Sequence, residues 1–425
     1  MEEQRKSESA LVPALRFEGF SDPWEQRKVG EILQIAFRAV DLEDDKKYQL
    51  VTVKRRNEGI VERARMAGRD ILVKSYQEIL AGDFVISKRQ LVHGGNGLVP
   101  PHLSRSIVSN EYLVIEESKD ISTEFWALIS RTKSMYRQYF LSSFGVDIEK
   151  LVFDVQDWKK REITLPKRRE QEKLETLFQK LDSLIALHQR KHEKLKTVKQ
   201  SLLEKMFPKE GEDAPELRFE DFTDPWEQRK LGDCFAFLQN NTLSRAELNG
   251  EGGVARNLHY GDILVKFGDC LANEVEELPY VSDAGIADKY AASFLLAGDI
   301  VFADTAEDEA AGKCIELLKL PSEPVVSGLH TIPARPKFSF GGGFLGHYLN
   351  SRSFHDQLLP LMQGIKVIAV SKAALQDTRI VFPSMEEQEA IGGMLCKLDS
   401  LIALHQRELE ILKNLKKAML EKMFV

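Results

Sequence analysis

The stretch KLDSLIALHQR occurs twice in this 425-residue chain, at residues 180–190 and at residues 397–407. Each copy lies inside a longer repeat that runs without a gap, at a constant offset of 217 positions, from Pro166 and Pro383 to a closing LEKMF. Apolar side chains recur through both repeats at alternating steps of three and four, which is the spacing of a coiled-coil seam. The repeats therefore predict two long helices that pair with each other.

The predicted seam has one polar interruption in each copy. His188 and His405 occupy equivalent places, so helices that pair antiparallel would bring the two imidazoles together. Two histidines are too few ligands for a metal site, and a polar seam position that sets the register of the pair is the favoured interpretation. The residues expected to face the other helix or a partner protein are Leu181, Leu184, Ile185, His188, Leu398, Leu401, Ile402 and His405.

A second repeat lies upstream of each helix. LRFEGFSDPWEQRKVGE stands at residues 15–31 and LRFEDFTDPWEQRKLGD at residues 217–233, and only four of the 17 positions differ. The offset here is 202, so the segments between the two repeats differ in length by 15 residues, and their sequences barely align. A tandem duplication that drifted uniformly would not preserve the ends and lose the middles. We therefore predict a conserved frame, a variable module and a conserved helix, twice over.

The predicted fold class is α+β, with two mixed α/β domains separated by two long antiparallel coiled-coil helices in a pseudo-twofold internal repeat. In the variable modules, two echoes of DILVK predict strands at residues 70–73 and 263–265, and helices are expected at residues 124–141 and 344–362. The predicted domains are a flexible tail at 1–13, a first variable domain at 14–165, a helix at 166–208, a short linker with the second variable domain at 209–382, and a second helix at 383–425.

The first variable module carries a cluster of cations inside an acidic chain. Residues 45–90 contain 11 Lys or Arg and six Asp or Glu, a balance of +5 in a chain whose formal net charge is −7. Arginine can bridge guanine through two hydrogen bonds, and both cations hold phosphate. A solvated charged surface explains the same composition equally well. The candidate DNA-contacting residues are Lys54, Arg55, Arg56, Arg63, Arg65, Lys88 and Arg89, with His93 and Asn96 from the Gly-rich segment HGGNGLVPP.

The second variable module is a less obvious reader of DNA. Its segment ADTAEDEAAGKC at residues 303–314 is strongly acidic, and acid repels phosphate, although Asp and Glu can accept a hydrogen bond from cytosine. The candidate DNA-facing cations of this module are Lys313, Arg335, Lys337, Arg352 and Lys366.

Motifs of several enzyme classes are absent from the sequence. It contains no GxxxxGK[ST] phosphate loop, no [DN]PP[YFW] tetrapeptide of amino-methyltransferases, no HExxH helix and no nucleophile elbow. Gly341, Gly343 and Gly346 satisfy GxGxxG, but no acidic residue follows at the distance that dinucleotide binding requires. We therefore predict a chain with no catalytic centre, no cofactor and no metal of its own.

Cysteine spacing and hydropathy bear on location. Cys234, Cys270, Cys314 and Cys396 are scattered, with no CxxC spacing, so neither paired disulfides nor a Cys-rich zinc site is predicted, and a reducing cytoplasm is expected. No apolar run approaches the roughly 18–20 residues that cross a bilayer, so no membrane partner is expected.

The duplicated plan resembles the DNA specificity subunit of type I restriction-modification systems, over nearly the whole chain. The most specific marks are P-x-x-x-E-Q leading into LD-x-L-I, at residues 166–185 and 383–402. Further marks are a Gly-Asp pair before an apolar strand, at residues 82–83 and 298–299, and the Ser-rich helix near residues 349–354. The acidic second module departs from the family's pattern, so tight DNA binding is expected only in a complex.

The resemblance implies a division of labour between this chain and its partners. Each variable module would be a target recognition domain that reads one half of a split, asymmetric site in double-stranded DNA. The helices would set the gap between the halves and dock two methyltransferase (modification) subunits, which restriction/translocase subunits can join. S-adenosylmethionine, ATP and magnesium would belong to those partners.

Two other functions fit the same repeats. A duplicated coiled-coil scaffold could bind proteins without touching nucleic acid. The chain could also be the recognition region of a fused restriction-methylation enzyme.

Overall fold

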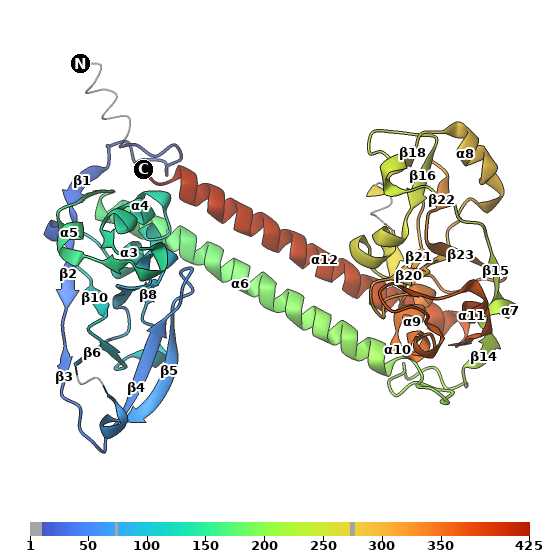
Figure 1. Ribbon diagram of the computed structural model, residues 1–425, viewed down its shortest axis with the longest axis horizontal. Coiled ribbons are helices and arrows are strands. Elements are labelled where there is room, and N and C mark those ends of the chain that lie inside the picture. The colour runs from blue at the N-terminus through green and yellow to red at the C-terminus, as the bar shows by residue number, and fades with distance from the viewer. Residues whose placement is uncertain (1–10, 73–74, 273–276) are drawn as a thin grey trace. The chain divides into compact units, whose positions relative to one another are not determined.

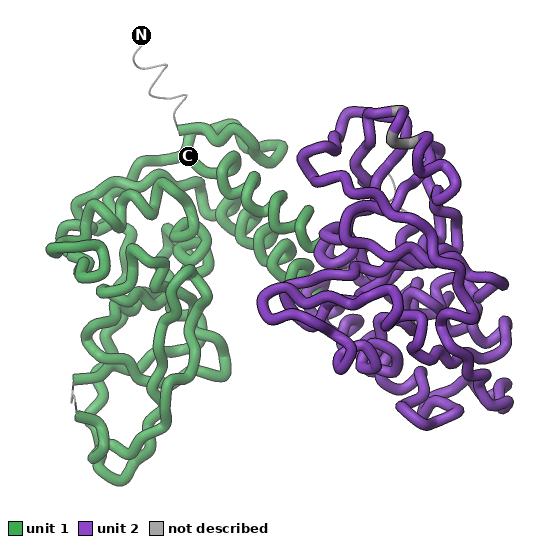
Figure 2. The backbone as a smooth tube through the Cα atoms, turned by 45° about the vertical axis from the view of Figure 1, so that its right-hand side comes forward, with its two compact units in different colours: residues 1–187, 408–425 green, residues 188–407 purple. Residues whose placement is uncertain are grey.

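The computed structural model describes residues 11–72, 75–272 and 277–425. The chain divides into two compact units, coloured separately in Figure 2: unit 1 comprises residues 1–187 and 408–425, and unit 2 comprises residues 188–407. Each unit holds one copy of the frame, one variable module and parts of both long helices. The predicted tail at 1–13 lies mostly outside the described residues.

Two sheets form the variable module of unit 1, in the blue and teal part of Figure 1. One has five strands in the order β3-β6-β9-β4-β5, and the other has four in the order β2-β10-β7-β8. Strands β4 and β5 form an antiparallel hairpin that carries most of the predicted cations. The strands are β2 Gln34–Ala36, β3 Ala39–Val40, β4 Lys47–Val53, β5 Ile60–Ala67, β6 Tyr76–Glu78, β7 Phe84–Ser87, β8 Asn96–Leu98, β9 Ile107–Ser109 and β10 Tyr112–Glu116.

Short helices and two small strand pairs complete unit 1. The conserved frame supplies β1, which pairs antiparallel with β13 at the end of the module. A buried aromatic cluster that includes Trp126, Tyr139 and Trp158 fills the space under these elements. The elements are β1 Glu25–Lys28, α2 Val29–Ile32, α3 Thr123–Ile129, α4 Lys133–Leu141, β11 Ser143–Phe144, β12 Val152–Phe153, α5 Val155–Lys159 and β13 Glu162–Leu165.

Unit 2 repeats the frame around a different module. Its main sheet has the order β15-β23-β19-β21-β17, and a three-stranded sheet has the order β18-β16-β22. The strands are β14 Glu227–Lys230, β15 Phe235–Phe237, β16 Ala255–Leu258, β17 Cys270–Leu271, β18 Tyr280–Val281, β19 Ile300–Ala303, β20 Thr305–Ala306, β21 Cys314–Leu317, β22 Val325–Ser327, β23 Thr331–Pro336, β24 Ile368–Ala369 and β25 Arg379–Phe382. The short helices are α7 Leu231–Cys234, α8 Ala284–Lys289, α9 Phe344–Asn350, α10 Arg352–His355 and α11 Lys372–Asp377.

The two conserved repeats form the long helices α6 Arg168–Lys205 and α12 Met385–Lys422, each of 38 residues. In unit 1 the start of α6 lies beside the end of α12, and in unit 2 the start of α12 lies beside the end of α6. Contacts in both units show that the helices run in opposite directions, because Phe178 meets Phe424 in unit 1 and Lys199 meets Asp399 in unit 2. The predicted fold class is confirmed. No helix of the described residues combines the length and hydropathy that spanning a membrane requires.

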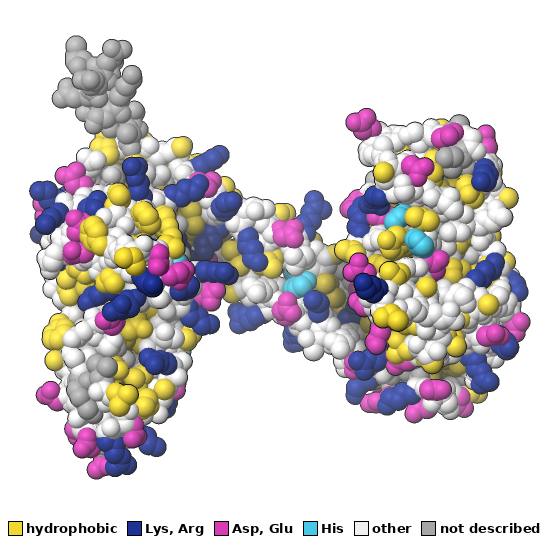
Figure 3. Space-filling view, in the orientation of Figure 1, with side chains coloured by type: hydrophobic (Ala, Val, Ile, Leu, Met, Phe, Trp, Pro, Cys, Tyr) yellow, Lys and Arg dark blue, Asp and Glu magenta, His cyan; other side chains and the backbone are white. Residues whose placement is uncertain are grey.

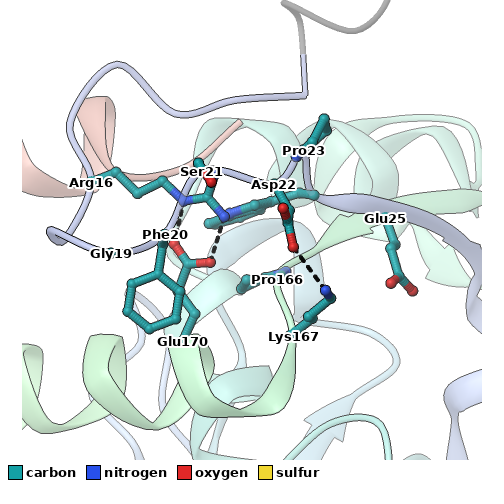
Figure 4. A pocket seen from close by; sticks show the side chains of 11 residues that line it. Arg16, Gly19, Phe20, Ser21, Asp22, Pro23, Glu25, Pro166, Lys167 and Glu170 are labelled. Carbon is teal, nitrogen blue, oxygen red and sulfur yellow. Dashed lines mark hydrogen bonds and ion pairs between the residues drawn. The ribbon is translucent and has the colours of Figure 1, made fainter.

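The P-x-x-x-E-Q mark joins the start of each long helix to its frame. We call the ion pair between the buried Glu of the mark and an Arg of the frame the latch. The Gln171 amide donates to the Pro166 carbonyl, 2.9 Å, while buried Glu170 accepts two hydrogen bonds from Arg16 at 2.7 and 2.8 Å (Figure 4). In unit 2 the equivalent pair is Arg218 with Glu387, at the same two distances, and Gln388 donates to Pro383 at 2.8 Å. A buried carboxylate needs such a charged partner, so the mark serves helix placement.

The closing LEKMF of each helix docks on the Trp of a frame. In unit 2, fully buried Phe207 packs edge-on against Trp226, and the Leu217 N–H donates to the Lys205 carbonyl at 2.8 Å. In unit 1, Phe424 packs against Trp24 and Phe125, and the Leu15 N–H donates to the Lys422 carbonyl at 2.9 Å. Each unit is therefore closed by the end of the helix that started in the other one.

The strand prediction for both DILVK echoes is wrong. Residues 262–266 form a π-helical turn, because the buried Asp262 carboxylate accepts the His259 N–H and two bonds from Arg245 and so holds the chain in a turn. In the first echo, Asp70 closes a 3-10 turn over Gly68–Asp70, Ile71 and Leu72 extend no strand, and residues 73–74 lie outside the described residues.

Both module helices are shorter than predicted. The segment 124–141 breaks into α3 and α4 because Thr132 is extended and its hydroxyl accepts the Met135 N–H, which starts a new helix. The segment 344–362 breaks after α9 because Ser351 is extended, and Leu359–Leu361 adds only a 3-10 turn. Capping by Ser and Thr overrides the apolar periodicity at both places.

Candidate functional site

The aspartate of KLDSLIALHQR makes an equivalent cross-helix ion pair in each unit. Asp182 pairs with Lys416 in unit 1, and Asp399 pairs with Lys199, 2.5 Å away, in unit 2. Lys199 also contacts Asp269 at 2.7 Å, and although burial works against its charge, the two carboxylates raise the pKa of Lys199 above its usual value. The two lysines are themselves 217 positions apart, so the repeat encodes the pair.

The seam histidines meet within unit 2. His188 Nδ1 lies 3.1 Å from His405 Nδ1, and one of these atoms must donate while the other accepts. Among the other predicted seam residues, Leu181 is buried, while Ile185, Leu398 and Ile402 are half-buried. Leu184 and Leu401 are exposed.

Exposed apolar side chains recur on the helices as matched pairs at the repeat offset of 217. These side chains keep between 39 and 48% of their surface, which is unusual for leucine and valine that serve only a coiled-coil seam. The pairs are Leu184 with Leu401, Leu187 with Leu404, and Val198 with Leu415.

Unit 1 has a hollow of about 530 Å³ between the β4–β5 hairpin tip, the Gly-rich loop and the start of α4. The Arg56 N–H donates to the His93 carbonyl at 2.7 Å and the Asn57 N–H to the Gly94 carbonyl at 2.9 Å, so the tip rests on the loop. A Cβ on Gly94 would lie 3.0 Å from the Asn57 nitrogen. The absence of a side chain on Gly94 therefore lets the tip of the β4–β5 hairpin pack closely against the Gly-rich loop. The basic residues that line the hollow are Arg55, Arg56, His93, Arg131 and Lys133.

The predicted cations of unit 1 differ in what already holds them. Within the described residues, Arg56 and Arg63 have neither an ion-pair nor a hydrogen-bond partner for their guanidinium groups. Arg131 and Lys133 were not predicted, because only the fold brings α4 to the hairpin tip. The other candidates have partners: Arg55 with Gln90 and Glu149, Lys54 with Glu58, Arg65 with Glu62, Lys88 with the Asn110 carbonyl, Arg89 with Glu111, and His93 with Glu149, while Asn96 is buried.

Figure 3 shows how these charges look on one face of the molecule. Over unit 1, Lys and Arg side chains are interspersed with Asp and Glu and do not gather into one basic face. The pairing of most candidate cations with carboxylates explains this appearance.

Three of the five candidates in unit 2 serve the fold. Arg335 makes a bidentate pair with buried Asp299 at 2.7 and 2.9 Å. The Lys313 ammonium donates to the Leu264 and Phe267 carbonyls at 3.2 and 3.3 Å, and burial lowers the pKa of Lys313. The Lys337 ammonium donates to the Gly232 carbonyl at 3.0 Å. Arg352 and Lys366 are exposed and have no ion-pair partner within the described residues.

The Gly-Asp mark has the same structural role in both units. Asp83 accepts the Leu80 N–H at 2.7 Å and pairs with Arg38, and Asp299 accepts the Leu296 N–H at 2.8 Å and pairs with Arg335. The glycine before each aspartate has a φ of +89°, which only glycine adopts without strain. The Gly-Asp mark is therefore a turn that an arginine holds in place.

The GxGxxG segment packs against α12. Buried Glu316 accepts the Gly343 N–H at 2.9 Å and the Gly346 N–H at 2.7 Å, at the place where a bound phosphate would sit. Burial raises the pKa of Glu316. A Cβ on Gly341 would lie 2.7 Å from the Glu389 nitrogen, so glycine is required there for helix contact.

The sequence and the fold of this chain are similar to those of known proteins. A family model for the type I restriction modification DNA specificity domain matches residues 21–197. The type I restriction enzyme MjaVIII specificity subunit of Methanocaldococcus jannaschii is 23% identical over 321 residues, which covers 74% of this chain and 72% of the relative. The putative MjaX specificity subunit of the same organism is 25% identical over 207 residues, 47% of this chain and 45% of the relative. A crystal structure of a type I restriction-modification S subunit from M. genitalium has a TM-score of 0.53 at 14% identity and covers 97% of this chain and 99% of that one, a likeness of fold.

Proposed function

The chain belongs to the family of type I restriction-modification DNA specificity subunits, and from this premise we propose that its two variable modules each read one half of a bipartite, asymmetric DNA target. The observation that supports this most strongly is the duplicated frame around two unlike modules, because one chain then presents two different surfaces to DNA. The family match also disfavours a scaffold that binds no nucleic acid and a fragment of a fused enzyme.

In unit 1 we propose that the hollow beside the hairpin tip and the outer face of β5 contact DNA. Arg56 and Arg63 carry the argument, because a cation without a protein partner can take a phosphate or a guanine at no cost in broken ion pairs. Arg131 and Lys133 line the same hollow, but each is already paired with a carboxylate, Arg131 with Asp182 and Lys133 with Glu421. Arg55, Arg65 and Arg89 would first have to leave their carboxylates.

In unit 2 we propose Arg352 and Lys366 as the DNA-facing cations among the five candidates. Arg352 lines a hollow of about 980 Å³ with Lys209 and Arg379. Arg335, Lys313 and Lys337 instead hold turns of the module together, as their contacts above indicate. The acidic stretch Glu307, Asp308 and Glu309 is exposed and would face away from phosphate.

We further propose that the helices dock two methyltransferase subunits through the matched exposed pairs defined above. Repeated apolar patches on a repeated helix suit two copies of one partner. The catalysis would then belong to the partners, which would bring S-adenosylmethionine, and restriction subunits would add ATP and magnesium.

Methylome sequencing of a host that carries this chain with its methyltransferase tests the two-reader proposal. We expect one split, asymmetric motif. Replacing residues 234–382 by the module of another specificity subunit should change one half of that motif and leave the other. Two unchanged halves would contradict the proposal.

DNA titration tests the binding itself. The chain, alone and with its methyltransferase, is titrated with duplex DNA at two salt concentrations. We expect binding by the complex that weakens steeply as salt rises, since phosphate contacts release counterions. Absence of any DNA-dependent signal in both states would favour the scaffold.

A further inference from the structure

Two thiol sulfurs and one imidazole nitrogen lie close together in unit 2, outside every surface assigned above. They are Cys270 Sγ on β17, His347 on α9 and Cys396 Sγ on α12, and one donor atom from each lies within 4.8 Å of the others. The two sulfurs are 4.0 Å apart, and Cys270 Sγ is 3.8 Å from His347 Nδ1. These residues lie 49 to 126 positions apart in sequence, so no spacing motif could reveal them.

We propose that Cys270, Cys396 and His347 form a binding site for a thiophilic divalent cation of the Zn²⁺ class. A tetrahedral zinc ion with Zn–S of about 2.3 Å and Zn–N of about 2.0–2.1 Å places two sulfurs about 3.8 Å apart and sulfur and nitrogen about 3.5 Å apart. The observed separations of 4.0 and 3.8 Å are within a few tenths of an ångström of these edges. A disulfide would need the sulfurs at about 2.05 Å, half of their separation.

The surroundings of His347 match those of a metal ligand. Its ring is fully buried, and Nε2 lies 2.8 Å from Asp399 Oδ2, so a carboxylate holds the nitrogen opposite the cysteines. Metal-bound histidines typically have such a carboxylate partner, which orients the ring. Nδ1 lies 2.5 Å from the Gly343 carbonyl oxygen, so binding of a cation at Nδ1 would require this hydrogen bond to break and the carbonyl to move aside.

Glycines leave room for both sulfurs. A Cβ on Gly343 would lie 2.5 Å from Cys396 Sγ, and a Cβ on Gly346 would lie 2.9 Å from Cys270 Sγ. The carbonyl oxygen of Gly343 lies 4.0 Å from Cys270 Sγ but only 2.5 Å from His347 Nδ1, which is shorter than an edge of a zinc tetrahedron, so a water would complete the coordination. The GxGxxG segment would thus serve a cation.

The site belongs to unit 2 alone. The position equivalent to Cys396 in the first repeat is Gln179, at the offset of 217. A bound cation would join the module, through β17 and α9, to the conserved helix α12. It is independent of the proposed DNA recognition and can be tested without DNA.

The test is metal retention by the full chain. The reduced protein is dialysed with ZnCl₂ and then against metal-free buffer, and its zinc is measured by plasma mass spectrometry. We expect about one zinc per chain for the natural protein and none for the double variant Cys270→Ser, Cys396→Ser. Cys234→Ser removes a buried cysteine outside the cluster, and His405→Gln removes a seam histidine, so both should retain zinc fully.

Cobalt gives a second measurement that does not depend on the folding of a variant. Co²⁺ added to the reduced natural chain should produce thiolate-to-cobalt charge transfer and the strong visible bands of a four-coordinate site. Absence of zinc and of these bands, retention of zinc by the double variant, or isolation of the chain with a Cys270–Cys396 disulfide in place of the metal would each overturn the proposal.

Discussion

Units 1 and 2 share their frames down to single hydrogen bonds but start the adjoining module helix in different ways. In unit 1, α3 begins after Ser122, whose hydroxyl accepts the Phe125 N–H and contacts Glu175 of α6. In unit 2, α9 begins after Gly343, and the buried Glu316 of β21 accepts the helix N–H groups directly. The same frame therefore tolerates two unlike solutions at the point where the module meets it.

The repeated aspartate of the long helices also has one partner that is the same in both units and one that differs. Asp182 and Asp399 each pair with the lysine of the other helix, but their second partners come from the modules and differ: Arg131 in unit 1 and His347 in unit 2. The contacts that hold the helices are repeated, and the contacts that hold the modules are not. A module can therefore diverge as long as the frame is preserved.

The largest difference in stability between the two units is expected at the phenylalanines that end the two LEKMF segments, Phe207 and Phe424. Phe207→Ala should lower the free energy of unfolding by about 4 kcal/mol, because the side chain is fully buried among aromatic rings. Phe424→Ala should cost about half as much, because Phe424 is only half-buried. Denaturant unfolding followed by hydrogen exchange in each unit measures both. Equal losses in the free energy of unfolding would show that the packing sites of Phe207 and Phe424 are equivalent.

Removing either latch should lower the free energy of unfolding by the same amount. Arg218→Ala and Arg16→Ala should each cost about 3 kcal/mol, because each leaves a buried carboxylate without its partner. The matched control is Arg229→Ala, which breaks an exposed pair with Glu227 and should cost about 0.5 kcal/mol or less. A loss of stability in one unit only would mean that the two latches contribute unequally although their distances are the same.

The two helix starts should differ in sensitivity. Glu316→Ala leaves two buried N–H groups without an acceptor and should cost about 2 kcal/mol. Ser122→Ala removes one cap and should cost about 1 kcal/mol. Thermal unfolding of the two variants side by side gives the difference, and a larger loss for Ser122→Ala would reverse the comparison.

The smallest expected effect concerns DNA. Arg56→Ala should weaken binding by the complex with methyltransferase about three- to tenfold and reduce the salt slope by about one. The guanidinium of Arg65 is already paired with Glu62, so Arg65→Ala should weaken DNA binding less than about twofold in the same titration. Equal effects would mean that pairing with carboxylates does not decide which cations reach DNA.

Much of the architecture could be predicted from the residues because it is written twice. The helices and the frame–module–helix plan follow from gapless repeats and a seam periodicity, whereas the antiparallel direction of the pair is shown by contacts in the structure. The module details could not be predicted, since Thr132, Ser351 and Asp262 redirect the backbone through single side-chain hydrogen bonds that periodicity does not register. Three of the candidate cations share this problem, because the carboxylate partners of Arg55, Arg89 and Arg335 are 22 to 94 positions away in sequence.

The sequence by itself determined that two modules stand on one repeated frame, because local periodicity and identity need no knowledge of neighbours in space. Only the tertiary structure decided which cations are already neutralised, why the Gly-Asp mark recurs, what the GxGxxG segment contacts, and that Cys270, His347 and Cys396 lie together. Those properties depend on contacts between segments far apart in the chain, and such contacts exist only once the chain has folded.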